Sequence, residues 1–308
     1  MTDQIRVFDR KSVRRHRDRS AASLPDCDFL LREIAERLAE RLEEVTRAFP
    51  LALDLGCRSG LLSETLGSRG GVEHLVQAEL SQALARHAAE NERSTVVADE
   101  EALPFGSNSF DLVLSLLSLH WVNDLPGALL QIRHALKPDG LFLAALFGGE
   151  TLRELRAVLL EAESEIESGA SPRVSPFAEL RDAGGLLQRA GFALPVADMD
   201  TITVRYPDAL ALMRDLRGMG ESNAVIGRRP GLSRRATLAR AAALYEERHR
   251  QADGKIPATF QVIFLTGWAP HESQQKPLAP GSAKTRLAEV LESEERAAGE
   301  AVPKGNPG

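Results

Sequence analysis

The sequence has few cysteines, no long apolar run and no excess of basic residues. Only Cys27 and Cys57 occur in 308 residues, and they form neither a CxxC pair nor a disulfide framework, which is typical of a reducing compartment. No apolar run approaches the roughly 20 residues that a membrane-spanning helix needs. The net charge is −6 and the pI is near 5.8. This balance argues against a general nucleic-acid-binding domain, since such domains are usually strongly basic.

The amino-terminal segment is rich in arginine but lacks the hydrophobic stretch of a secretory signal. Asp3, Asp9 and Asp18 also depart from the acid-poor composition of transit peptides. We therefore expect a cytoplasmic protein in which residues 1–28 form a basic arm. The arm could be a solvated face, dock on an acidic partner, or cover the ligand cleft described below. Its cations are Arg6, Arg10, Lys11, Arg14, Arg15, Arg17 and Arg19.

From residue 29 onward the apolar pattern alternates between helix and strand. Residues 29–45 repeat apolar side chains at helical spacing, which predicts an amphipathic helix. Continuous apolar runs then predict strands that are buried on both faces, as in a parallel sheet covered by helices. Alternating units of this kind predict an α/β fold with a doubly wound sheet, with helical insertions at about 151–193 and 208–253. The predicted strands are 51–56, 74–80, 94–99, the first part of 110–122, 141–147, 199–206 and 259–268.

The turn after the first predicted strand is a candidate ligand site. Ligands of an open α/β sheet bind outside the carboxyl ends of the strands, which is where Asp54, Gly56 and Gly60 are expected. The glycines let the backbone turn sharply and approach a ligand closely. Asp54 could accept hydrogen bonds from the turn or from an ammonium group. A plain strand-to-helix connection is the alternative interpretation.

Acidic residues end the second and third predicted strands. Glu79 could bind both hydroxyls of a ribose, or it could be an acid favoured by the dipole of the next helix. Asp99 could accept a hydrogen bond from an exocyclic amine, or it could cap a loop. Glu100, the next residue, belongs to the same candidate cofactor set.

Together these segments resemble the class I methyltransferases that bind S-adenosylmethionine. LDLGCRSG, an acid after the second strand, ADEEALPF and SFDLVLS followed by HW occur in the order and spacing of that superfamily. The resemblance implies a Rossmann-like sheet, mostly parallel with an antiparallel last strand, and S-adenosylmethionine as cofactor. It implies that Asp54 and Gly56 face the methionine part, Glu79 the ribose and Asp99 the adenine. Arg58 stands where the pattern usually has a third glycine, so it could pair with the methionine carboxylate or weaken cofactor binding.

A closer resemblance covers nearly the whole chain. SLLSLHWVNDLP, LFGGETLREL, GMGESNA and HESQQKPLAPGSA resemble the complex I assembly factor family with arginine-hydroxylase activity. The chain departs from that family at Arg58, and at Pro280, where the family tends to have arginine. The resemblance implies hydroxylation of an arginine on the quinone-side subunit of NADH dehydrogenase (complex I), in support of early assembly. Because no long leader precedes Phe8, we expect a bacterial-type member.

Polar residues outside the cofactor set are candidates for the substrate side. His120 follows the fourth predicted strand and could be a general base, or a structural histidine. The loop that contains ESN could be a lid or a surface turn. No iron triad of two histidines and a carboxylate is assigned, no metal ligand is assigned, and hydroxylation follows from the resemblance alone. The substrate-side candidates are Trp121, Glu221, Ser222, Asn223 and His271.

Three functions and three segments are therefore expected. The first function is the arginine hydroxylase of complex I assembly. The second is an ordinary methyltransferase acting on a small molecule or protein, and the third is a non-catalytic assembly chaperone. A peripheral position at the membrane is compatible with each of them, whereas a nucleic-acid partner is not expected.

The segments are the arm at 1–28, a cofactor-binding domain at 29–273 and a disordered tail at 274–308, which is rich in proline, glycine, alanine and charge.

Overall fold

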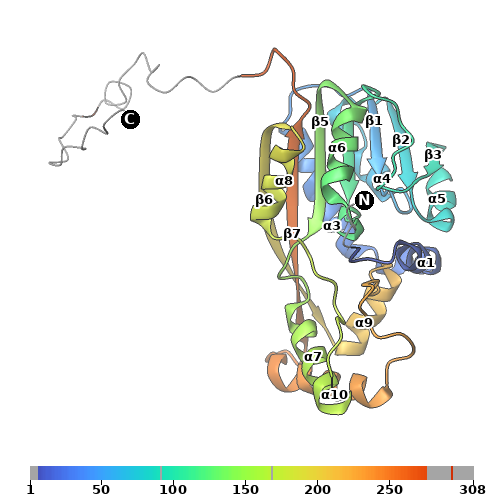
Figure 1. Ribbon diagram of the computed structural model, residues 1–308, viewed down its shortest axis with the longest axis vertical. Coiled ribbons are helices and arrows are strands. Elements are labelled where there is room, and N and C mark those ends of the chain that lie inside the picture. The colour runs from blue at the N-terminus through green and yellow to red at the C-terminus, as the bar shows by residue number, and fades with distance from the viewer. Residues whose placement is uncertain (1–5, 91, 168, 276–292, 294–308) are drawn as a thin grey trace. The chain divides into compact units, whose positions relative to one another are not determined.

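The computed structural model describes residues 6–90, 92–167, 169–275 and 293 (Figure 1). Residues 1–271 form one compact unit, and residues 272–308 form a second. The expected tail at 274–308 lies outside the described residues except for Gln274, Gln275 and Ser293. Within the described ranges, no helix combines the length and the apolar character that crossing a bilayer requires.

A seven-stranded sheet in the order β3-β2-β1-β4-β5-β7-β6 forms the centre of the first unit. β7 pairs antiparallel with both β5 and β6, and the pairs among β1 to β5 are parallel. The predicted doubly wound sheet with an antiparallel last strand is therefore confirmed. The strands are β1 Leu51–Leu55, β2 His74–Glu79, β3 Ser94–Val97, β4 Phe110–Leu116, β5 Leu136–Phe147, β6 Ala193–Tyr206 and β7 Ile256–Trp268.

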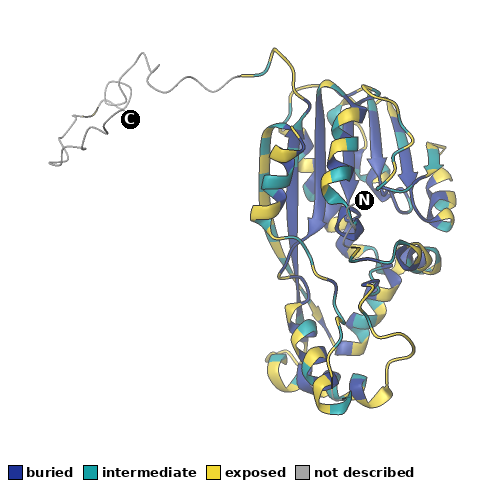
Figure 2. Cartoon of the chain, viewed as in Figure 1, coloured by how far each residue is buried: buried dark blue, intermediate teal, exposed yellow. Residues whose placement is uncertain are grey.

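Helices cover both faces of the sheet, whose residues are mostly buried (Figures 1 and 2). α3 (Phe29–Glu43) and α4 (Leu61–Leu66) pack on one face, and α6 (Leu125–Ala135) and α8 (Leu180–Arg189) pack on the other. The predicted amphipathic helix at 29–45 is α3, whose apolar stripe is almost fully buried. The remaining helices are α1 Arg10–Ser20, α2 Leu24–Cys27, α5 Gln82–Ala89, α7 Arg153–Glu167, α9 Ala209–Gly218, α10 Arg235–His249 and the short 3₁₀ helices Arg69–Gly71 and Leu119–Trp121.

β6 and β7 are longer than the sequence suggested. β6 begins at Ala193 rather than at 199. The sequence did not indicate its first half, because residues 193–199 are mostly apolar without alternating polar residues and include Pro195, which is unusual inside a strand. β5 ends at Phe147, which pairs with Val262, so the β6–β7 ribbon continues past the parallel strands. α7, α9 and α10 pack on that continuation, and they build one wall of the cavity described below.

The basic arm packs on the rest of the first unit. Asp9 begins α1 by accepting a hydrogen bond from the backbone N–H of Ser12, and α1 contacts α5 and α9. Phe8 and Val13 are buried in a small apolar cluster with Trp121. The ring centroids of Phe8 and Trp121 lie 5.3 Å apart in an edge-to-face arrangement. These contacts place α1 over the carboxyl ends of the parallel strands, where ligands of such sheets bind.

Candidate cofactor cleft and substrate cavity

The loop that follows β1 has the backbone of a ligand-binding turn. It lies between β2 and β4, at the point where the strand order reverses. Gly56 and Gly60 have φ values of +74° and +86°, a conformation that favours glycine. A Cβ atom on Gly56 would overlap with the side chain of Ser118. Gly56 is therefore needed for close packing as well as for the turn.

Asp54 is a buried carboxyl group without a partner. Its side chain is fully buried, and neither carboxylate oxygen has a hydrogen-bond partner among the described residues. Burial and then the charge of Glu79 raise the pKa of Asp54 to about 8. Most buried polar groups are satisfied, and a buried titratable group with a perturbed pKa often marks a functional site. Asp54 is thus suited to a cationic or hydrogen-bond-donating ligand.

The pKa of Asp54 leads to a pH-dependent stability. Because its folded pKa lies above the ordinary value of 3.8, the stabilising contribution is complete below about pH 4 and is lost as the pH rises through about 8. We expect the free energy of unfolding to fall over this window, by up to about 1.4 kcal/mol per pH unit. Urea titrations at pH 5 and pH 8 measure this fall. In Asp54→Asn, the free energy of unfolding should not show the part of the fall that Asp54 causes. If the free energy of unfolding fell equally with pH in the wild type and in Asp54→Asn, a protonated Asp54 would be contradicted.

Glu79 and Glu100 bind an arginine of the basic arm. Nη1 of Arg17 lies 3.0 Å from Oε1 of Glu79 and 3.0 Å from Oε1 of Glu100, and Nη2 donates to Oγ of Ser118 at 2.8 Å. The Arg17 side chain is 0% exposed. Burial alone would lower the pKa of Arg17, but Glu79 and then Glu100 raise it, so the guanidinium stays charged. For Arg17, the structure agrees with the interpretation of the arm as a cover for the cleft.

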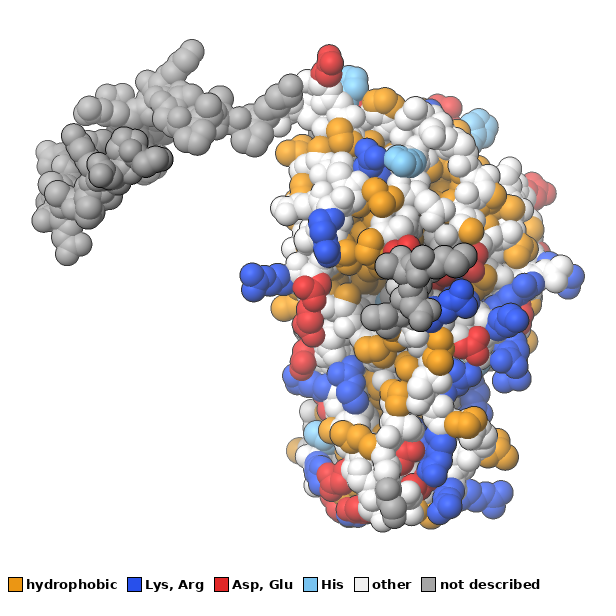
Figure 3. Space-filling view, in the orientation of Figure 1, with side chains coloured by type: hydrophobic (Ala, Val, Ile, Leu, Met, Phe, Trp, Pro, Cys, Tyr) orange, Lys and Arg blue, Asp and Glu red, His pale blue; other side chains and the backbone are white. Residues whose placement is uncertain are grey.

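Arg10 closes the outer end of the same cleft. Its Nη2 donates to Oδ1 of Asp99 at 2.6 Å and also pairs with Glu100. The Asp99 side chain is 33% exposed, so this end of the cleft borders solvent. Side chains of the arm that point away from the cleft are exposed, and cations gather over α1 in the surface view (Figure 3). These exposed cations are Lys11, Arg14, Arg15 and Arg19.

Arg58 has a different role from the two that we considered. Its guanidinium donates to the carbonyl oxygens of Met219 and Leu117, each at 2.8 Å, and pairs with Glu221. Its backbone N–H donates to Oε2 of Glu79 at 2.9 Å. The residue is 2% exposed. Arg58 therefore connects the loop after β1 to the 218–223 loop, and its charge is already paired within the chain.

Glu221 is the centre of a buried polar cluster. Its Oε2 accepts a hydrogen bond from Nε1 of Trp121 at 2.9 Å and lies 3.1 Å from Nε2 of His120. Burial alone would raise the pKa of Glu221, but Arg58 and then His120 lower it to about 2, so the carboxylate is charged. Burial lowers the pKa of His120, which favours a neutral imidazole. The structure thus brings Trp121 and Glu221 together, as expected for two substrate-side residues.

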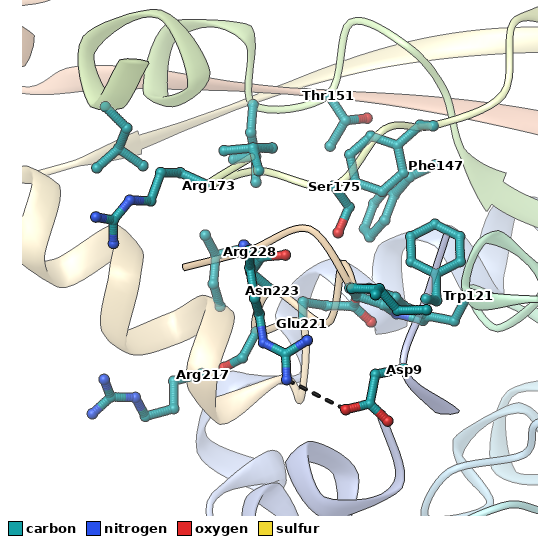
Figure 4. Close-up of a pocket in the computed structure, with 18 of the residues that line it drawn as sticks. Asp9, Trp121, Phe147, Thr151, Arg173, Ser175, Arg217, Glu221, Asn223 and Arg228 are labelled. Atoms are coloured by element: carbon teal, nitrogen blue, oxygen red, sulfur yellow. Dashed lines mark hydrogen bonds and ion pairs between the residues drawn. The ribbon is translucent and has the colours of Figure 1, made fainter. Parts of the chain in front are cut away.

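A cavity of about 1200 Å³ opens beside Glu221 and Trp121 (Figure 4). Asp99 and Glu101 also line it, so it borders the outer end of the cleft. It is larger than the usual small-molecule pocket of about 300–1,000 Å³. Its apolar lining includes Phe147, Leu152, Leu155, Leu159, Phe177, Met213, Leu216 and Phe260, and its polar lining includes Thr151, Ser175, Ser222 and Asn223.

The two predicted histidines lie outside this lining. His120 is packed behind the wall, with its ring centroid 4.9 Å from that of Phe147, and its Nδ1 has no hydrogen-bond partner within the described ranges. The general-base role of His120 stays a prediction. His271 follows β7, whose last residue Trp268 pairs with Leu141 near the start of β5. The structure does not bring His271 to this site, because that end of the sheet is opposite the carboxyl ends of the parallel strands.

The residues of the cleft fit an adenosyl cofactor in kind, but two side chains of the arm pair with them, Arg10 at the outer end and Arg17 inside. Asp54 has free acceptor atoms, and the glycines give backbone access. Arg17, however, already binds carboxylate oxygens of Glu79 and Glu100. In the part of the chain that the structure describes, no group of three or more His, Cys, Asp or Glu residues is placed to hold a metal ion.

Comparison with known proteins gives matches of two kinds. Residues 53–144 match the family described as a methyltransferase domain. The chain is 47% identical to "Arginine-hydroxylase NDUFAF5, mitochondrial" of Danio rerio, over 93% of this chain and 90% of that one. It is 36% identical to "Malonyl-[acyl-carrier protein] O-methyltransferase" of Methylovorus sp. (strain MP688), over 88% of this chain and 92% of that one. The YcgJ protein of Bacillus subtilis shares the fold, with a TM-score of 0.54 and 14% identity over 78% of this chain and 99% of that one.

Proposed function

The chain belongs to the family of the arginine-hydroxylase NDUFAF5, and from this premise we propose that it is an enzyme that adds an oxygen atom to an arginine of a protein substrate. The observation that carries this proposal is the 47% identity over 93% of the chain. From the motif resemblance we propose that the substrate is the quinone-side subunit of NADH dehydrogenase (complex I). We propose a cytoplasmic location for this chain, whereas the relative from Danio rerio is named as mitochondrial.

The cavity wall offers a place for the guanidinium of a substrate arginine. Glu221 is anionic and lines the cavity, and contacts with Arg58, His120 and Trp121 fix its orientation. These three contacts use three of about four acceptor positions of a carboxylate, so one remains for a ligand. The indole of Trp121 lines the same wall and can pack against a planar cation. The apolar side chains of the lining lower the local dielectric constant, which strengthens the attraction between a bound guanidinium and Glu221.

We propose S-adenosylmethionine as the cofactor of the cleft. Asp54 would receive the ammonium group, Glu79 the ribose hydroxyls and Asp99 the adenine amine. Glu100 would add a further negative charge beside them. When bound, the cofactor supplies a methyl group on a sulfonium sulphur. Gly56 and Gly60 allow the loop after β1 to approach the ligand closely. A methyltransferase domain over residues 53–144 supports this assignment.

Loss of the Asp99 carboxylate should weaken cofactor binding. Removal of one hydrogen bond to a charged group costs about 1.5–3 kcal/mol, so Asp99→Ala should raise the dissociation constant by about 10- to 150-fold. Titration calorimetry with S-adenosylmethionine measures this change. Asp198→Ala is the matched control, because Asp198 is an exposed carboxylate that pairs with Arg41 instead. Wild-type protein that binds no S-adenosylmethionine would contradict the cofactor assignment.

The proposed activity can be tested by deletion of the gene. We expect the quinone-side subunit to lose the mass of one oxygen atom and NADH dehydrogenase to assemble poorly. The measurements are the intact mass of that subunit and the amount of assembled enzyme, with a complemented strain as control. Normal assembly together with an unchanged subunit mass would reject a protein-directed function.

A second candidate function is methyl transfer to an acidic substrate. The relative from Methylovorus supports it, and arginines line the cavity. Arg229 pairs with Glu167 and Arg228 with Asp9, so much of this positive charge is already compensated. Release of S-adenosylhomocysteine together with a methylated product would favour this candidate. A bound partner without any product would favour the assembly chaperone instead.

A further inference from the structure

The acceptor atoms of Glu79 are almost fully used in this structure. Its Oε1 accepts from Arg17 at 3.0 Å and from the backbone N–H of Ser81 at 2.8 Å, and its Oε2 accepts from the backbone N–H of Arg58 at 2.9 Å. A carboxylate has about four acceptor positions, so about one is left. The two hydroxyls of a ribose need two acceptor positions. Glu79 therefore cannot hold Arg17 and a complete ribose diol together.

The Arg17 side chain also fills the inner cleft. Residues at its outer end, Asp99 and Glu101, line the 1200 Å³ cavity. By contrast, Asp54, Gly56 and Glu79 do not appear among the described residues that line it. Arg17 is 0% exposed and has two carboxylates and a hydroxyl as partners. Its guanidinium is therefore held within the set of residues proposed for the cofactor.

The other side chains of α1 that contact the site are only partly buried, and Arg10 pairs with Asp99 and Glu100 at the outer end of the cleft. Asp18 accepts a hydrogen bond from Oγ of Ser81 at 2.6 Å, and Nδ1 of His16 lies 3.1 Å from the carbonyl oxygen of Ser222. Arg17 provides the only fully buried charge among the side chains of α1 that the structure describes. Withdrawal of Arg17 would leave Glu79 without a side-chain cation and Glu100 with Arg10 alone, which is unfavourable unless another ligand enters. A cationic cofactor would replace the lost charge and would also satisfy the oxygens of Asp54.

We propose that Arg17 and the ribose of the cofactor compete for Glu79, so that cofactor binding requires Arg17 to leave the cleft. Arg17 is thus a positioning residue of the cofactor site, and α1 is its movable cover. Removal of the Arg17 charge relieves the competition and raises the apparent affinity, because the binding-competent form is no longer a minor population. This inference rests on the proposed cofactor.

Titration calorimetry with S-adenosylmethionine on the full chain tests the competition. We expect Arg17→Gln to lower the dissociation constant by at least about tenfold. In the wild type, the apparent affinity is reduced because only a small fraction of the molecules has an open cleft. Arg19→Gln is the control, because Arg19 is an exposed cation on the same helix; it should bind as the wild type does. Unchanged or weaker binding by a folded Arg17→Gln protein would overturn the inference.

A second measurement needs no variant. Hydrogen exchange of the α1 amides in the wild type should become faster when S-adenosylmethionine saturates the protein, because Arg17 no longer anchors the helix. Unchanged or slower exchange at saturation would overturn the inference even if Arg17→Gln fails to fold. If neither the wild type nor Arg17→Gln binds S-adenosylmethionine, the inference falls together with the cofactor assignment. If S-adenosylmethionine binds and the exchange of the α1 amides does not change, the competition is rejected but the cofactor assignment stands.

Discussion

Arg58→Ala is expected to lower the free energy of unfolding by about 3–5 kcal/mol, because removal of one partner leaves a buried charge uncompensated. The side chains of Arg58 and Glu221 are 2% and 5% exposed, so solvent cannot replace the lost cation. The carbonyl oxygens of Leu117 and Met219 lose their donor in the same substitution. Arg58→Gly relieves the positive φ of 53° at this position, worth about 1–3 kcal/mol, yet we still expect a net loss of stability.

Urea denaturation of four proteins measures this effect. The wild type, Arg58→Ala, Glu221→Gln and the double variant form a cycle, and we expect the double variant to lose less stability than the sum of the two single losses. Arg37→Ala is the control, because Arg37 forms a partly exposed pair with Glu33, the kind of pair that contributes about 0–1 kcal/mol. An Arg58→Ala protein that is no less stable than Arg37→Ala would show that Arg58 does not act as a buried link.

Glu221→Gln is expected to reduce arginine modification by about 10- to 150-fold, which corresponds to the loss of a 1.5–3 kcal/mol charged hydrogen bond to the substrate. The substitution keeps the shape of the side chain and removes its charge. The time course of modification of the quinone-side subunit, in a deletion strain that carries the variant, gives the rate. Asp198→Asn is the control for loss of a carboxylate elsewhere, and the amount of each variant in the cell corrects for stability. Full modification by Glu221→Gln would contradict the role of Glu221 in substrate binding.

The cofactor loop and the sheet could be predicted because their signals are local. Asp54, Gly56 and Gly60 follow one strand directly, and the structure places Glu79 and Asp99 at the ends of the neighbouring strands. The first half of β6 was missed, since its apolar residues do not alternate with polar ones and Pro195 interrupts the run. The antiparallel direction of the last strand followed from the resemblance, because hydrophobic periodicity specifies neither the direction nor the neighbours of a strand.

The partners of Arg17 and Arg58 could not be predicted from local patterns. Arg17 pairs with residues 62 and 83 positions away, and Arg58 pairs with Glu221 at a separation of 163. A run of arginines at one end of a chain usually indicates a solvated face, and five of the seven cations of this arm are exposed. Only the fold reveals that Arg10 and Arg17 pair with the acidic residues of the cleft and that Arg17 is fully buried there. The role of Asn123, which accepts hydrogen bonds from the backbone of Val7 and Phe8 at 2.8 Å, was hidden for the same reason.

Whether this chain hydroxylates an arginine of a complex I subunit can be read from the fragment masses of the arginine-containing peptides of the quinone-side subunit. These peptides are compared between the parent strain and a strain that lacks the gene. If the claim is correct, one arginine carries an added oxygen atom in the parent strain and none in the deletion strain. An arginine that instead carries a methyl group, or peptides that are identical in both strains, would contradict it.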